Sequence, residues 1–176
     1  ESGTADRDFA PIELDALLRE IADDVNFECS NRGQEVVLLQ LEPAVAVGSR
    51  ELLRQAIENV VRNGAWYTPP GTAVEISLMI CADPPGNRRD ALIHIRDHGP
   101  GVPEEAFPRI LEPFFRVSEA RDRTSGGTGI GLAITQQAVK RHGGTISLHN
   151  ATAGQGLVVD IRLPLIPAKP APGQPG

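Results

Sequence analysis

The sequence lacks several features that would place it in common classes of protein. No apolar run approaches the roughly 20 residues that a membrane-spanning helix needs, and the net charge of −6 argues against a general binder of nucleic acid or acidic membranes. The two cysteines, Cys29 and Cys81, have no CxxC motif and no neighbouring histidine, which suits a reducing cytoplasm better than a disulfide scaffold or a metal site. The chain also begins at Glu1 without an initiator Met or a signal peptide, so we expect a fragment of a longer protein.

What is present is the composition of one soluble globular domain. The chain has 176 residues, of which 40% are hydrophobic and 23% are charged. Apolar spacing predicts helices over about 13–30, 50–65 and 128–142, and Ser49 fits the N-cap of the second helix. Alternating stretches predict strands near Phe9 and over 36–41, 74–80, 91–97, 145–148 and 157–163. We therefore expect an α+β fold, a two-layer α/β sandwich with a mixed, mostly antiparallel sheet and helices on one face.

The second helix carries a row of polar residues beside its apolar stripe. This row consists of Gln55, Asn59, Arg62, Asn63 and Trp66. Asn59 and Asn63 are stacked one turn apart and present amide oxygens in one direction, which suits Mg²⁺, a hard cation that takes few protein ligands. A helix face that merely meets solvent would show the same pattern, so this row alone leaves both interpretations open.

The stretch Asp97-His98-Gly99-Pro100-Gly101 follows a predicted strand. Asp97 shares strand parity with Ile93 and Ile95, which directs its carboxylate toward the interior, where it needs a hydrogen-bond donor. An adenine amino group is such a donor, and flanking glycines let a base approach the backbone closely. A capped turn is the alternative, because Asp-x-Gly occurs in many loops.

The run Gly126-Gly127-Thr128-Gly129-Ile130-Gly131-Leu132 leads into a predicted helix. Glycines at a helix N-terminus expose backbone N–H groups to a phosphate chain. The run lacks the Gly-Lys-Ser/Thr ending of a Walker A loop and does not follow a strand directly, as a dinucleotide fingerprint would. A Gly-rich linker is the alternative.

Together and in this order, these stretches resemble the sequence boxes of the catalytic domain of bacterial sensor histidine kinases. Asn59 to Asn63 matches the N box, 97–101 the G1 box, Glu112-Pro113-Phe114-Phe115-Arg116 the F box, and 127–132 the G2 box. The resemblance covers about residues 8–165 at family-like spacing. The run 119–123, ahead of Ser125-Gly126-Gly127, is similar to that of CpxA-type envelope-stress sensors.

The resemblance implies a Bergerat-type ATP site. Asn63 would ligate Mg²⁺, Asn59 would support the phosphates, and Asp97 would receive the adenine amino group. The base would have room beside Gly99 and Gly101 and would pack against Tyr67. The phosphates would be held by the G2 box, that is by Gly127, Thr128, Gly129, Gly131 and Leu132.

The resemblance also implies a mobile lid over about 99–127. The F-box residues Phe114, Phe115 and Arg116 would place this lid and contact the phosphoacceptor domain. The basic residues Arg116, Arg121 and Arg123 would be candidates for stabilising transition-state charge.

Two residues depart from the family pattern. The family usually has Lys or Arg three residues after the second N-box asparagine, where this chain has Trp66. Either Trp66 packs at the pocket rim while Arg62 or a lid arginine serves the phosphates, or ATP binding is weakened. Pro108 falls in a short lid helix, which it is expected to end early.

The resemblance favours a kinase over a hydrolase. Related ATPases activate water with a Glu at the position of Asn59, and an amide cannot act as a general base. Glu58 is adjacent but points about 100° away around the helix. None of the four histidines is followed by the acidic residue and proline of the family's phosphoacceptor motif, so we expect them to be structural or surface residues. The alternatives are a nucleotide-sensing module without phosphotransfer and a Ser/Thr kinase of the anti-sigma-factor type.

The expected organisation has three parts. Residues 1–8 are a linker remnant, 9–165 the catalytic domain, and 166–176 a proline-rich, non-globular tail. The implied partners are the dimerisation and phosphoacceptor domain of the parent homodimer and a response regulator, with no nucleic acid. We expect the fragment to be monomeric, without membrane insertion, and cytoplasmic, in a parent anchored in the bacterial inner membrane.

Overall fold

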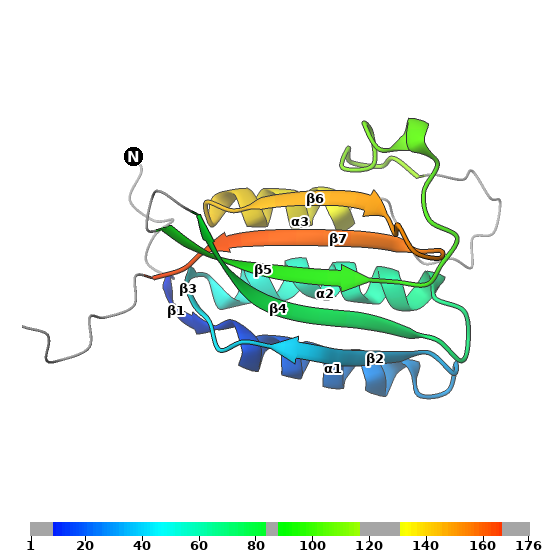
Figure 1. The fold of residues 1–176 in the computed structure, drawn as a ribbon, viewed down its shortest axis with the longest axis horizontal. Helices are drawn as coiled ribbons and strands as arrows, with labels where there is room; N and C mark the ends of the chain where they lie inside the picture. Colours follow the sequence, from blue (N-terminus) through cyan, green and yellow to red (C-terminus); the bar gives the residue numbers. More distant parts are fainter. Residues whose placement is uncertain (1–8, 84–87, 117–130, 167–176) are drawn as a thin grey trace, which may run out of the picture.

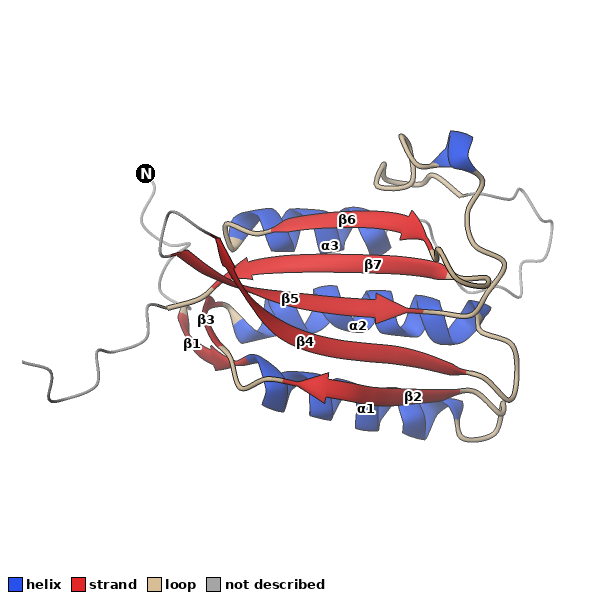
Figure 2. Cartoon of the chain, in the orientation of Figure 1, coloured by secondary structure: helices blue, strands red, loops and turns tan. Residues whose placement is uncertain are grey.

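The computed structural model of the chain describes residues 9–83, 88–116 and 131–166, which form two layers. One layer is a five-stranded sheet in the order β2-β4-β5-β7-β6, and helices cover one face of it (Figures 1 and 2). The edge strand β2 (Glu35–Leu41) runs parallel to β4 (Ala73–Asp83). The remaining neighbours pair antiparallel, and they are β5 (Arg88–Arg96), β7 (Leu157–Pro164) and β6 (Thr145–Asn150). The expected α+β sandwich with a mostly antiparallel sheet is confirmed.

The helical layer consists of α1 (Leu14–Cys29), α2 (Arg50–Tyr67) and α3 (Gly131–Arg141), with α2 in the middle (Figure 1). The helices pack on one set of alternate strand residues, which are almost fully buried: Ile76, Leu78, Ile93, Ile95 and Ile161. Alternation places these side chains on one face of the sheet. Burial of this face against the apolar helix stripes is the main stabilising contribution to the fold.

A second, two-stranded sheet was missed by the sequence patterns. Residues 45–48, which none of the predicted strands includes, form β3 (Val45–Gly48), and β3 pairs antiparallel with β1 (Ala10–Glu13). A four-residue strand is too short to give a clear period. Ala46 also bridges to Leu165, and Ile166 donates its N–H to Val45 O at 3.2 Å. Both ends of the described chain therefore meet at this small sheet.

The ends of the helices follow local chemistry. Ser49 caps α2, since its Oγ accepts the N–H of Leu52 at 3.5 Å, as expected. The helix continues two residues beyond the expected end at Ala65, because the stop is set by Thr68, which precedes a proline and adopts ψ 127°. The expected start of α3 at Thr128 lies outside the described residues, and its end is set by Gly143 at φ 71°.

The segment after β5 has little regular structure. A 3₁₀ helix, Glu104–Ala106, follows Pro103 and is succeeded by turns up to Phe114. This 3₁₀ helix ends at Ala106, ahead of Pro108, which agrees with the expected effect of that proline. No helix within 9–83, 88–116 or 131–166 combines the length and hydropathy that crossing a bilayer requires.

Candidate functional site

Asn59 and Asn63 lie where α2 meets the N-terminal end of α3. A β-carbon placed on Gly131 would lie 3.8 Å from the Cβ of Asn59, so this side of α2 faces the first turn of α3. Both asparagines are half-buried, and within the described chain neither side-chain amide forms a hydrogen bond. No residue of the described segments therefore occupies their amide oxygens.

A buried threonine fastens the first turn of α3 to α2. The hydroxyl of Thr135 lies 2.9 Å from both Ala56 O and Gly131 O and donates to this pair of carbonyls. Leu132 packs, partly buried, against the hydrophobic core. The other expected phosphate-binding residues of the G2 box, Gly127, Thr128 and Gly129, lie outside the described residues, as do Arg121 and Arg123.

Asp97 follows β5 and is 6% exposed. Its Oδ1 accepts two backbone hydrogen bonds, from Gly99 N at 2.9 Å and from Leu157 N at 3.0 Å. No group of the described chain donates to Oδ2, so this oxygen can accept a hydrogen bond from a ligand. Burial raises the pKa of the carboxyl above its ordinary value of 3.8, and the two backbone donors partly oppose that rise.

The turn after Asp97 is packed closely against the end of α2. A β-carbon on Gly99 would lie 2.9 Å from both the Cβ and the carbonyl oxygen of Tyr67, which only glycine tolerates. The N–H of His98 donates to the buried Thr68 Oγ1 at 3.0 Å. These contacts bring the half-exposed ring of Tyr67 to the same end of the sheet as the Asp97 carboxylate. Tyr67 therefore occupies the space that a side chain on Gly99 would need.

The F-box residues lie at the end of the segment that follows β5. Phe114 is 74% exposed and adopts φ 66°, the left-handed region that is unfavourable for a bulky residue. The ring of Phe115 packs under the guanidinium of Arg109, with 4.7 Å from Cζ to the ring centre. Arg116 is the last described residue of this segment.

Arg62 does not lie with the asparagines, contrary to one expectation. It forms ion pairs with Glu28 of α1 at 2.6 Å and with Glu58 at 2.9 Å. The hydrogen bond from Arg62 holds the pKa of Glu28 below its usual value. Further ion pairs join the same two helices, from Arg50 to Glu20 and from Arg54 to Glu20 and Asp24. Since α1 occupies the flank of α2 that Arg62 faces, this arginine is engaged in helix packing.

Trp66 packs against the turn between α1 and β2. The guanidinium of Arg32 lies over its indole ring at 4.2 Å, and 41% of the tryptophan remains exposed. This cation–π contact draws the side chain toward α1, away from the α3 side of α2 where Asn59 lies. Trp66 therefore packs at the rim, and Arg62, which is paired with Glu28 and Glu58, does not replace the usual cation.

Each of the four histidines has a protein partner. His94 pairs with Asp160 at 2.7 Å, and His149 approaches the same carboxylate at 3.9 Å. His98 pairs with Glu75 at 3.0 Å. The buried His142 donates from Nδ1 to Ala138 O at 2.6 Å and accepts the N–H of Ser49 at Nε2, 3.0 Å away.

The hairpin between β6 and β7 holds the Asp97 turn, and no pattern in the sequence indicated this contact. Leu157 both donates to the Asp97 carboxylate and accepts the Asp97 N–H through its carbonyl at 3.0 Å. Its partner across the hairpin, Asn150, binds the backbone of Val102. These contacts join residues 48 to 60 positions apart, so no local pattern could have indicated them.

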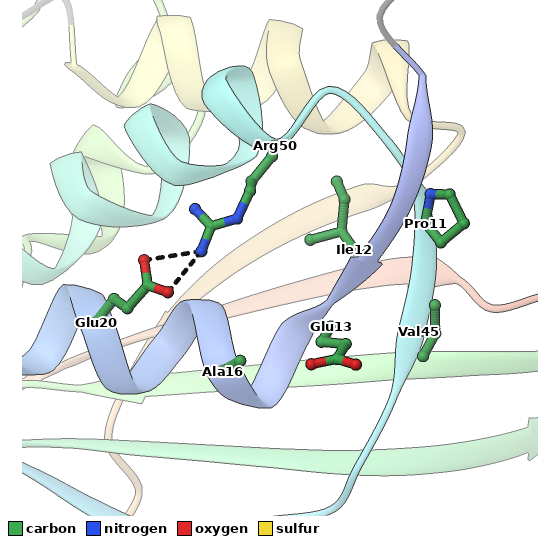
Figure 3. Close-up of a pocket in the computed structure, with 7 residues that line it drawn as sticks. All are labelled: Pro11, Ile12, Glu13, Ala16, Glu20, Val45 and Arg50. Carbon is green, nitrogen blue, oxygen red and sulfur yellow. Dashed lines mark hydrogen bonds and ion pairs between the residues drawn. The ribbon is translucent and has the colours of Figure 1, made fainter.

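A separate hollow of about 490 Å³ lies beside β1 and β3, at the end of the sheet where β5 begins, opposite to Asp97 (Figures 1 and 3). In Figure 3, Arg50 reaches across it to the carboxylate of Glu20. The rest of its wall consists of Pro11, Ile12, Glu13, Ala16 and Val45. None of the expected site residues lines this hollow, and its one arginine is already paired with Glu20.

Comparisons with known proteins agree with this arrangement. The family of histidine kinase-, DNA gyrase B- and HSP90-like ATPases matches residues 48–167. The sensor histidine kinase CpxA of Escherichia coli strain K12 is 36% identical over 155 residues, 88% of this chain but 32% of CpxA, so the chain spans about a third of that relative. The solved mycobacterial sensor histidine kinase MprB superposes with a TM-score of 0.75 at 29% identity, over 90% of this chain and 98% of MprB. Full-length ShkA, solved in complex with AMPPNP, has a TM-score of 0.72 at 25% identity, over 91% of this chain and 32% of ShkA.

Proposed function

The chain belongs to the family of histidine kinase-, DNA gyrase B- and HSP90-like ATPases, and we propose that it is the catalytic domain of a sensor histidine kinase. In this proposal it binds Mg-ATP and donates the γ-phosphate to a histidine on a separate dimerisation and phosphoacceptor domain. The parent would be a homodimer in the bacterial inner membrane, and the phosphoryl group would pass on to a response regulator.

The observation that carries nucleotide binding is the state of the Asp97 carboxylate. It is buried, and both backbone donors bind Oδ1, which leaves Oδ2 for a ligand. A carboxylate in a largely buried position favours a hydrogen-bond donor at each oxygen, and the amino group of adenine would supply the donor for Oδ2. Tyr67, at the same end of the sheet, offers a half-exposed ring beside the base.

The asparagines fit a phosphate-bound Mg²⁺. Their amide oxygens are hard neutral ligands that no described residue occupies, and Mg²⁺ characteristically takes few protein ligands while phosphates and waters fill the rest. Asn63 would ligate the ion, and Asn59 would hold the phosphates against the first turn of α3. Bound Mg²⁺ would offset the charge of the phosphates.

The residues favour transfer to a protein over hydrolysis. Asn59 has no basic group that could take a proton from water. Glu58, the adjacent carboxylate, lies between Arg62 at 2.9 Å and Arg54 at 3.9 Å, on the flank that faces α1. An acid that is ion-paired on the wrong flank of the helix is a poor general base for the phosphate site.

The phosphoacceptor histidine would belong to another domain. The four histidines of this chain are occupied by Asp160, Glu75 and backbone groups, at positions that serve the sheet and the helix ends. A nucleotide-sensing module without phosphotransfer is the second candidate, and the replacement of the usual basic residue by Trp66 is the observation that favours it.

The decisive experiment mixes the chain with the separately purified dimerisation and phosphoacceptor domain of its parent and labelled Mg-ATP. We expect acid-labile label on the acceptor domain, no label on the chain alone, and little ATP turnover without the acceptor. Binding of ATP without transfer would support the nucleotide-sensing module, and fast turnover by the chain alone would support a hydrolase.

A further inference from the structure

Asn150, the last residue of β6, holds Val102 through both groups of its side-chain amide. Its Oδ1 accepts the N–H of Val102 at 2.8 Å, and its Nδ2 donates to the carbonyl of Val102 at 2.7 Å. A side chain that satisfies both backbone groups of one residue fixes that residue much as a neighbouring strand would.

The same amide lies against the glycine turn of the nucleotide site. Val102 directly follows Gly101, which adopts φ 75°, and a β-carbon on Gly101 would lie only 2.7 Å from Asn150 Oδ1. The turn that begins at Asp97 therefore ends on Asn150, which leaves no room for a side chain between them.

The two ends of the turn are attached to one pair of residues. Asn150 and Leu157 are partners in the β6–β7 register. Leu157 binds the carboxylate and the N–H of Asp97, while Asn150 binds Val102. A single cross-strand pair of the hairpin, Asn150 and Leu157, thus sets the position of the turn relative to the Asp97 carboxylate.

We propose that Asn150 is a positioning residue for the nucleotide: it fixes the backbone of 99–102 relative to the Asp97 carboxylate, and so the opening that the adenine enters. This inference rests on the proposed function. Asn150 does not touch the base; it acts through the turn. Loss of its amide would free both backbone groups of Val102 and let the turn move into the space of the base.

The chain contains a matched control for a purely structural role. Asn26 of α1 binds Val36 of the edge strand β2 in the same way, with Nδ2 donating to Val36 O at 2.9 Å and Oδ1 accepting the Val36 N–H at 2.7 Å. Both asparagines are half-buried and both make two bonds to one residue. They differ in place, since Val36 lies in the edge strand on the α1 side and belongs to no part of the Asp97 turn.

The experiment compares wild type, Asn150→Ala and Asn26→Ala by calorimetric titration with ADP and Mg²⁺, beside denaturant unfolding. We expect the two substitutions to lower the free energy of unfolding by similar amounts. Only Asn150→Ala should weaken ADP affinity, by about five- to tenfold if roughly one hydrogen bond's worth of positioning is lost. If Asn150→Ala and Asn26→Ala bind ADP with the same affinity, whether that affinity equals the wild-type value or lies below it, the inference is overturned. Failure of the wild type to bind ADP would instead overturn the proposed function.

A second variant and a second measurement cover the case in which Asn150→Ala does not fold. Asn150→Ser keeps a short polar group that can satisfy one of the two backbone groups of Val102. In this variant we expect faster hydrogen exchange at the Val102 amide together with a smaller loss of ADP affinity. Faster exchange at Val102 with wild-type affinity would show that the turn does not control binding, and would overturn the inference equally.

Discussion

The carboxylate of Glu58 lies 2.9 Å from the guanidinium of Arg62, one turn further along α2. This pair faces α1, where Arg62 also meets Glu28. The neighbour of Glu58 in sequence, Asn59, faces α3 instead. One residue of helical rotation thus separates the flank that packs on α1 from the flank that faces the nucleotide site.

Glu58→Gln should therefore leave phosphotransfer and any residual ATP turnover unchanged. The substitution removes the charge that Glu58 presents to Arg54 and Arg62. Because the Glu58 side chain is only 14% exposed while both arginines remain partly exposed, we expect the free energy of unfolding to fall by about 1–2 kcal/mol. Transfer assays and denaturant unfolding at matched protein concentration would check both statements. A marked fall in either chemical rate would mean that Glu58 serves the reaction after all.

Asp97→Asn should abolish most nucleotide binding while preserving the fold. The amide oxygen can still accept the N–H groups of Gly99 and Leu157, but the amide nitrogen places a donor where adenine also presents one. Such a buried mismatch costs about 1–3 kcal/mol, or about 5- to 150-fold in affinity. Titration with ADP beside a thermal melt measures the two effects separately, and unchanged affinity would show that the carboxylate is structural.

The raised pKa of Asp97 predicts a dependence on pH with a definite sign. The folded chain binds this proton more readily than the unfolded chain, whose carboxyl titrates at about the ordinary value of 3.8. The contribution of the group to stability is complete below that pH and is lost as pH rises through the higher folded pKa. The free energy of unfolding of wild type minus that of Asp97→Asn should therefore fall as pH rises from about 4, and then level off.

ADP affinity should show the opposite trend, because a protonated Asp97 is a poorer acceptor for adenine. In the wild type, the affinity for ADP should decline as pH is lowered toward 3.8. The variant Asp97→Asn, which carries no titrating group at this position, is the control. The same pH profile in both proteins would assign the effect to another carboxyl group.

Trp66→Lys should tighten ATP binding or speed phosphotransfer in trans by severalfold. A lysine here would add one charge contact with the phosphates of ATP, worth about 1–2 kcal/mol of binding free energy, at a helix face next to Asn63. The lost contact between Trp66 and Arg32 is partly exposed, so its removal should lower the free energy of unfolding by only about 0.5–1 kcal/mol. Trp66→Leu, which also loses the indole but adds no charge, is the control. If the lysine and leucine variants bind ATP alike, the usual cation is already replaced by other residues of the chain.

Gly48→Ala should destabilise the fold without touching the nucleotide site. A methyl group on Gly48 would collide with the ring of His142 and break its hydrogen bond with Ser49, at an expected cost of about 2–4 kcal/mol. Gly71→Ala is a useful comparison, since Gly71 has φ 82° and open space around it, so only backbone strain is added. Denaturant unfolding should rank Gly48→Ala as the more harmful, and equal costs would show that His142 moves aside freely.

Local patterns in the sequence predicted the larger elements and the direction of single side chains. The spacing of apolar residues located α1 and α2, and strand parity correctly predicted the burial of Asp97. The four-residue strand β3 was missed because a period needs more residues than it has.

The partners of a side chain could not be predicted in the same way. A helical wheel places Arg62 beside Asn59, but the flank of Arg62 is occupied by α1, whose Glu28 is 34 residues away. Similarly, Asn150 shows no pattern of its own, since its role depends on Val102, 48 residues earlier. Contacts of this kind are decided by the packing of the layers.

The small sheet of β1 and β3 has a consequence for how the domain can be built into other proteins. The bridge from Ala46 to Leu165 and the hydrogen bond from Ile166 to Val45 bring both ends of the described chain to the end of the main sheet that lies opposite Asp97 (Figure 1). A domain whose two ends leave side by side can be inserted into a loop of a host protein, or have its ends joined and be reopened elsewhere, with little distortion. In either arrangement the nucleotide end would face away from the junction and remain open to solution.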